Sequence, residues 1–151
     1  MKLHRLTQSQ HIERPRDEVF RFFADPRNLE PLTPPWLRFH FVGEPPAELG
    51  VDSMLDYRIR LYGVPVGWRA RIDVWEPPDR FVDVQVSGPY AYWHHTHSFK
   101  EDPAGTGTIM DDEVDYAMPL GPIGEIARMF FVGPSLRRIF AYRKARVGEI
   151  F

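Results

Sequence analysis

The spacing of apolar and polar side chains changes along the chain from helical to strand-like and back to helical. In Arg16–Ala24, the apolar residues Val19, Phe20 and Phe23 fall on one side of a helix, and the mixed run Leu3–Ile12 before it has the length of a strand. We therefore expect a strand followed by a helix at the start of the chain.

The next segment, Asn28–Trp36, contains three prolines: Pro31, Pro34 and Pro35. Proline has no amide hydrogen to donate and disrupts a helix interior. At most one further helical turn is therefore expected before the strands begin.

Between residues 37 and 118 the pattern is that of strands. Six runs rich in β-branched and aromatic residues are separated by short breaks of glycine, proline and aspartate. Short breaks favour hairpins, so we expect an antiparallel meander and not a parallel sheet with helical crossovers. The expected strands are Arg38–Gly43, Ser53–Leu61, Pro65–Glu76, Arg80–Ser87, Tyr92–Lys100 and Thr108–Tyr116.

Helical spacing returns near the C-terminus and predicts a long helix. Gly133-Pro134 interrupts the pattern, so we expect a kink or a restart at this point. The second half of the helix is basic, and a solvated face is expected there, with a protein-binding or ribosome-binding patch as the alternative. The apolar positions are Ile123, Ile126, Ala127, Phe130, Leu136, Ile139 and Phe140, and the basic ones Arg137, Arg138, Arg143, Lys144 and Arg146.

The length and composition of the chain agree with one globular domain spanning residues 1–151. The absence of cysteine excludes disulfides and thiolate chemistry. No apolar run is long enough for a membrane span, and the first ten residues lack the apolar core of a signal peptide, so a cytoplasmic location is expected. A net charge of −2 supplies no overall field for nucleic acid or an anionic membrane. We expect no nucleic-acid partner, no cofactor, and a monomer or homodimer.

Side-chain alternation predicts which residues face the interior. Trp93, His95, His97 and Phe99 share one face of their strand, and on the next strand Asp111, Glu113 and Asp115 belong in water. The inward set on that strand is then Thr108, Met110, Asp112, Val114 and Tyr116. If Phe99 stands opposite Thr108, His95 comes opposite Asp112 and His97 opposite Met110. The same register places Asp83 beside His95 and Gln85 beside Trp93, although Val82, Val84 and Val86 form an equally plausible inward set.

These positions suggest a polar patch on an aromatic wall, the usual form of a small-molecule site. The alternative is a buried hydrogen-bond network that only fixes the sheet. The candidate ligand-binding residues are Trp68, Asp83, Gln85, Trp93, His95, His97, Phe99, Met110, Asp112, Tyr116 and Phe130.

Two chemical roles for this patch remain open beside simple binding. His95, oriented by Asp112, is a candidate catalytic base for removing a proton next to a carbonyl. A metal bound by His95, His97 and a carboxylate is a further alternative, but no metal site is expected, because only two of the histidines share this face.

The order of elements and several groups of residues resemble one superfamily. Pro15, Val19, Phe20, Phe23, Asp25, Asn28 and Leu29 are similar to a P-x-x-x-V-F-x-x-F-x-D-x-x-N-L opening, and residues 81–99 to an F-x-D-x-Q-x-x-G-P-x-x-x-W-x-H-x-H-x-F run. Gly107, Thr108, Asp112, Val114, Tyr116 and Pro119 follow in the same order. Both groups resemble the bacterial ligand-binding and polyketide-cyclase-like branch of the START-like, Bet v 1-like superfamily.

The resemblance implies an α+β helix-grip fold, in which a curved antiparallel sheet of about seven strands wraps around a long C-terminal helix. It also implies a cavity for a small hydrophobic ligand that is lipid-like, polyketide-like or quinone-like. A non-catalytic binder is the leading hypothesis. A cyclase or isomerase, or a protein-interaction module, is the alternative.

Overall fold

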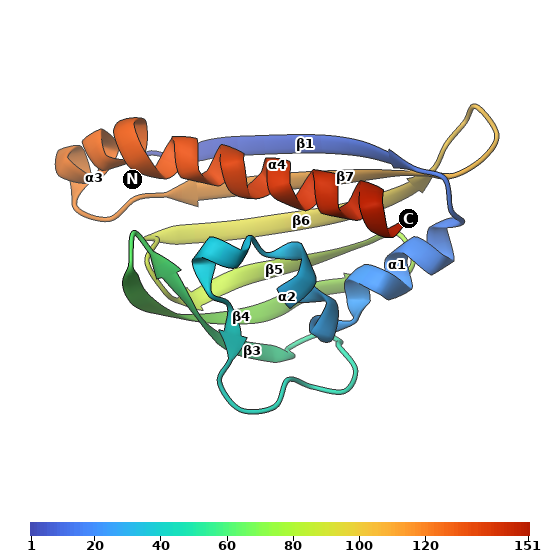
Figure 1. The fold of residues 1–151 in the computed structure, drawn as a ribbon, viewed down its shortest axis with the longest axis horizontal. Helices are drawn as coiled ribbons and strands as arrows, with labels where there is room; N and C mark the ends of the chain where they lie inside the picture. The colour runs from blue at the N-terminus through green and yellow to red at the C-terminus, as the bar shows by residue number, and fades with distance from the viewer.

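A curved antiparallel sheet and a long C-terminal helix form the two layers of the computed structural model, which describes residues 1–151 (Figure 1). The sheet has seven strands in the order β1-β7-β6-β5-β4-β3-β2. Every neighbouring pair is antiparallel, and β1 closes the meander by pairing with β7. The strands are β1 His4–Ile12, β2 His40–Phe41, β3 Met54–Leu61, β4 Val64–Glu76, β5 Arg80–Ser87, β6 Tyr92–Glu101 and β7 Thr108–Ala117. The helix-grip prediction is confirmed.

Short helices connect the first strand to the rest of the sheet. These are α1 Arg16–Ala24, the 3-10 turn η1 Pro26–Asn28, α2 Leu29–Leu32 and the 3-10 turn η2 Pro35–Leu37. Helix α1 begins and ends where its sequence pattern predicts, and it packs Val19, Phe20 and Phe23 inward. Its aromatic rings form an edge-on cluster with Phe81 and Phe99 of the sheet.

The C-terminal helical region has three successive parts: α3 Gly121–Ala127, a π-helical segment η3 Arg128–Val132, and α4 Gly133–Ile150. Pro134 cannot donate a hydrogen bond to the preceding turn, and the wider π turn lies directly before it. The irregularity expected at Gly133-Pro134 therefore takes the form of a π-helical turn. Helix α4 runs along the concave side of the sheet (Figure 1).

The inward faces predicted for β6 and β7 are confirmed. Residues 93, 95, 97 and 99 of β6 and all five inward residues of β7 are buried, and the residues between them are half-buried. Two apolar clusters form the core. One lies between α1 and the sheet end near Phe99, and the other lies around Trp68, Trp93 and Phe140.

The predicted pairing of β6 with β7 is wrong by two residues. Glu101, not Phe99, stands opposite Thr108, so His97 comes opposite Asp112 and His95 opposite Val114. The hairpin turn is tighter than expected, because the amide of Asp102 bonds to the carbonyl of Gly107 and extends the ladder toward the turn. The predicted pairing of Asp83 with His95 is confirmed.

The apolar stripe in the first part of the long helix does not pack against the sheet. Ile123, Ile126 and Phe130 lie on one apolar stripe, as the spacing predicts, but this stripe faces solvent and not the sheet. Gly124 is the buried residue of α3, and a Cβ at this position would collide with the carbonyl oxygen of Pro119. The close approach of Gly124 to Pro119 fixes the glycine inward and the apolar stripe outward.

Candidate functional site

An apolar cavity lies between the inner face of the sheet and α4. Its volume is about 200 Å³, and most of its lining residues are hydrophobic. The lining includes Leu55, Trp68 and Trp93 from the sheet, and Leu136 and Phe140 from α4. Such a volume suits one or two fused rings or a short acyl chain, since a cavity of about 150 Å³ holds benzene.

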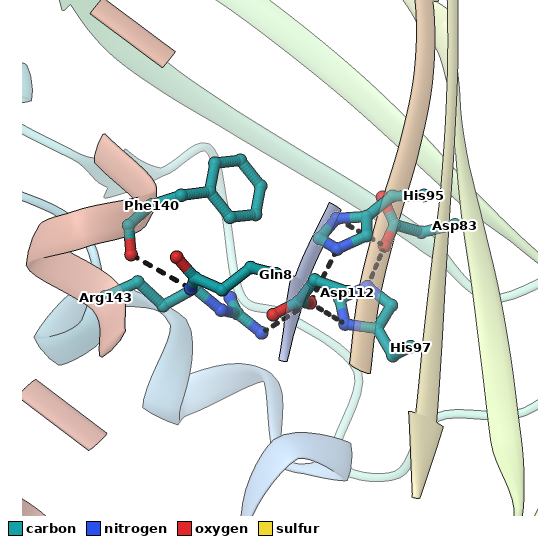
Figure 2. Close-up of polar contacts among 7 residues, drawn as sticks. All are labelled: Gln8, Asp83, His95, His97, Asp112, Phe140 and Arg143. Atoms are coloured by element: carbon teal, nitrogen blue, oxygen red, sulfur yellow. Dashed lines mark hydrogen bonds and ion pairs between the residues drawn. The ribbon is translucent and has the colours of Figure 1, made fainter. Parts of the chain in front are cut away.

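The polar corner of this cavity is a cluster of two histidines and two aspartates (Figure 2). His95 Nε2 lies 2.8 Å from Oδ1 of Asp112, and His97 Nε2 lies 2.6 Å from Oδ2 of Asp83. The two imidazole rings stack with centroids 3.7 Å apart. Asp83, His95 and His97 line the cavity, whereas Asp112 does not.

The strand register produces a crossed arrangement of these four side chains. His95 stands opposite Asp83 on β5 but bonds to Asp112 on β7, and His97 stands opposite Asp112 but bonds to Asp83. Diagonal neighbours across a sheet are within reach of long side chains. Each carboxylate therefore contacts both imidazoles, with the longer contacts at 3.9 Å and 3.5 Å.

Arg143 of α4 completes the cluster from the helix side (Figure 2). Its guanidinium lies 3.7 Å from Asp112, its side chain is only 12% exposed, and its Nε has no hydrogen-bond partner. The expectation of a solvated basic face is wrong for this residue. Leu136, Ile139, Phe140 and Arg143 together form the inward stripe of α4, and all four line the cavity.

Charge balance keeps both aspartates ionised. Burial by itself raises the pKa of Asp112, but Arg143 and the hydrogen bond with His95 outweigh it and hold this pKa well below its usual range. Burial also opposes ionisation of Asp83, where the hydrogen bond with His97 and the nearby positive charges lower the pKa below its usual value. The cluster thus presents carboxylates to the imidazoles.

His97 is neutral at neutral pH. Burial and the neighbouring His95 lower its pKa to about 4, against the opposing pull of Asp83. Neutral His97 donates from Nε2 to Asp83, which leaves a lone pair on Nδ1 without a hydrogen-bond partner. Because the two imidazole rings are stacked, a positive charge on both histidines at once is disfavoured.

This pKa shift predicts an acid-sensitive fold. Between pH 6.5 and about 4 the unfolded chain binds a proton at His97 and the folded protein does not, so the free energy of unfolding falls as the pH falls. The loss is on the order of 3 kcal/mol when it is complete. In His97→Gln, whose amide still donates to Asp83, a smaller loss is expected in urea unfolding at pH 7 and pH 4.5. His94→Gln, on the opposite face of β6, controls for the removal of one imidazole. An equal loss in His97→Gln and the wild type would show that another group is responsible.

The other predicted site residues lie around the cavity without lining it. Gln85 bonds through its side-chain amide to the amide and carbonyl of Tyr90, so it holds the turn before β6. Phe99 and Met110 belong to the core cluster near α1, and Tyr116 packs against Trp93 in the other core cluster. Phe130 lies in η3 and is exposed to solvent. Trp68, Asp83, Trp93, His95 and His97 are the predicted residues that the structure brings to the cavity wall.

Sequence reasoning missed Tyr57, Tyr90 and Arg143, which also line the cavity. Burial raises the pKa of Tyr57 and Tyr90, so both hydroxyls keep their protons. Tyr57 shares one face of β3 with Leu55 and Ile59, because residues two apart on a strand point the same way. This spacing was the available signal for Tyr57.

Asp83, His95 and His97 each bring one potential metal-ligand atom to within 4.8 Å of the other two. Two imidazoles on one ion must direct their lone pairs at a common point. Here the rings stack at an interplanar angle of 26°, and His95 Nε2 is occupied by Asp112. The geometry fits a hydrogen-bonded pair better than a metal centre.

Fold and site together define a helix-grip container with a largely apolar cavity and a buried polar cluster in its wall. The sequence agrees with this class: residues 12–139 match the family described as polyketide cyclase / dehydrase and lipid transport. The chain belongs to this family. The sequence matches none of the curated proteins with which it was compared. None of its helices is long and apolar enough to cross a membrane.

Solved structures share this fold at low sequence identity. The Zhui aromatase/cyclase from a Streptomyces species superposes with a TM-score of 0.75 at 15% identity, covering 98% of this chain and 93% of that one. A START superfamily protein from Mycobacterium smegmatis gives 0.69 at 11% identity, covering 98% and 99%. A major latex-like protein from Panax ginseng gives 0.63 at 10% identity, covering 96% and 95%. Identities this low establish the fold alone.

Proposed function

We propose that the protein binds a small hydrophobic molecule, lipid-like, polyketide-like or quinone-like, in the cavity between the sheet and α4. The observation that carries this proposal is a largely apolar cavity of about 200 Å³ whose wall includes the cluster of Asp83, His95 and His97. In such a site the apolar walls supply affinity, and the few polar groups select and orient the ligand.

The polar corner supports a ligand that bears a hydroxyl, phenol or enol group. Oδ2 of Asp83 accepts the hydrogen bond from His97 and also lies nearest to His95. Oδ1 of Asp83 contacts neither histidine and is free to accept a hydrogen bond from a ligand. Trp68 Nε1 is buried without a partner on the same wall, so it is available to donate. A buried donor without a partner carries a free-energy penalty that a ligand oxygen removes.

The test uses 2-naphthol and naphthalene as a matched pair of probes in isothermal titration calorimetry. A hydrogen bond to a charged group contributes about 1.5–3 kcal/mol, so 2-naphthol is expected to bind at least about tenfold more tightly than naphthalene. In Asp83→Asn, which still accepts from His97, this difference is expected to shrink. Absence of binding by both probes would refute the proposal. Equal affinities in the wild type would refute the role of Asp83.

An acid–base enzyme is the second candidate, and the pairing of His95 with Asp112 favours it. With Nε2 bonded to Asp112, Nδ1 of His95 carries the lone pair that accepts a proton from carbon next to a carbonyl. Asp112 would then stabilise the imidazolium. The two candidates differ in whether the bound molecule changes, so the mass and structure of a ligand recovered after incubation distinguish them.

A further inference from the structure

The end of the molecule that carries α3 and η3 exposes a group of eight large apolar side chains. Six come from residues 120–131 and two from the β3–β4 hairpin, and each is 56–76% exposed. Tyr62 joins the two segments, because its ring packs edge-on against Phe131 and its hydroxyl donates to the carbonyl of Phe131. This apolar end face consists of Tyr62, Val64, Leu120, Ile123, Ile126, Met129, Phe130 and Phe131.

The charged residues of the same helical region do not interrupt this face. Glu125 bonds to His4 of β1 at 2.9 Å, and Arg128 bonds to Glu125 at 3.3 Å. The stripe Ile123, Ile126, Phe130 is thus uncharged and turned to solvent, the reverse of an ordinary surface helix. Monomeric soluble proteins rarely expose large apolar patches, and those they expose mark interaction sites.

Basic side chains border the apolar end face. Arg60 bonds to the carbonyl of Gly63 beside Tyr62, and Arg137 lies near Gly133, directly after η3. Both are exposed, and neither forms an ion pair with an acidic residue. This local excess of positive charge contrasts with the net charge of −2 of the whole chain.

We propose that the apolar end face docks onto an anionic lipid bilayer. Aromatic and aliphatic side chains bordered by arginine are the combination that inserts at a membrane interface. A second copy of the chain fits less well, because two such faces brought together would place arginines of like charge against each other.

The cavity adjoins this face, and here the inference rests on the proposed function. Leu61, next to Tyr62, lines the cavity, as does Leu136, one turn after Val132. A docked protein would therefore place the cavity wall against the bilayer, the source of an apolar ligand. Docking would let the ligand pass between the bilayer and the cavity without crossing water.

The test is cosedimentation with vesicles of phosphatidylcholine, with and without phosphatidylglycerol. We expect the wild type to bind the anionic vesicles, and the double variant Ile126→Asp/Phe130→Asp to bind them about tenfold or more weakly, since two inserted apolar side chains are lost. Arg60→Gln/Arg137→Gln is expected to weaken binding to anionic vesicles only. Val51→Asp/Val86→Asp replaces apolar side chains exposed elsewhere on the molecule and is the matched control.

The outcomes separate this inference from the proposed function. Ile126→Asp/Phe130→Asp is expected to bind 2-naphthol as the wild type does, because neither residue lines the cavity. Vesicle binding without 2-naphthol binding would refute the proposed function and leave docking standing. No wild-type binding to anionic vesicles, or equal binding by the double variant, would overturn docking. A dimer that the double variant dissociates, with no vesicle binding, would assign the face to self-association.

Discussion

Asp112→Ala is expected to lower the free energy of unfolding by about 3–5 kcal/mol, the cost of leaving one partner of a buried ion pair alone. The side chain of Asp112 is only 6% exposed and accepts from His95 at 2.8 Å. It is also the carboxylate nearest to Arg143, whose charge would remain buried after the substitution. Both histidines would lose a contact with Asp112, and only one of the two carboxylates of the crossed arrangement would remain.

Urea unfolding at pH 7 measures this effect, with two comparison variants. Asp111→Ala lies on the opposite face of β7 and is expected to change stability by less than about 0.5 kcal/mol. Asp112→Asn keeps an acceptor for His95 but removes the charge opposite Arg143, so an intermediate loss is expected. A loss below about 1 kcal/mol in Asp112→Ala would contradict the view that this carboxylate holds the cluster together.

Ala70→Phe is expected to reduce the affinity for 2-naphthol by about tenfold or more, because the phenyl ring takes up ligand space. Ala70 is buried on β4 between Trp68 and Ile72, and all three line the cavity. An empty apolar volume accepts the added ring with little strain, so the variant is expected to fold.

Arg69→Phe places the same ring on the exposed face of β4 and is the matched control for Ala70→Phe. It removes a surface ion pair with Asp56, which contributes little to stability. Calorimetric titration of both variants compares a filled cavity with an unfilled one. Retention of wild-type affinity by Ala70→Phe would place the ligand elsewhere.

The faces of β6 and β7 could be predicted because alternation along a strand is a local property. Three acids at alternate positions of β7 determine its solvent face, and Trp93 and Phe99 determine the inner face of β6. His95, His97 and Asp112 of the polar corner followed from these faces, whereas Asp83 did not, because the sequence left the inward face of β5 undecided. Its role in ligand binding stays a prediction.

The pairing register could not be predicted in the same way, because it depends on the turn. The bond from Asp102 to Gly107 shifts β6 by two residues, a step that preserves every inward face and changes every partner. The contact between His95 and Asp112 survives the shift as a diagonal one. Its geometry therefore required the structure.

The long helix shows the limit of periodicity more clearly. Spacing identified an apolar stripe in α3, but only the tight packing of Gly124 on Pro119 determines that Ile123 and Ile126 face outward. In α4 the charge of Arg143 suggested solvent, whereas its place on the stripe with Leu136 and Phe140 brings it to the cavity. Tertiary packing decided both cases.

A crystal structure of the protein with 2-naphthol tests the proposed binding site most directly. We expect the ring between the sheet and α4, against Trp68 and Phe140, with its hydroxyl within hydrogen-bond distance of Asp83. A bound ring on the surface, with the cavity empty, would contradict it.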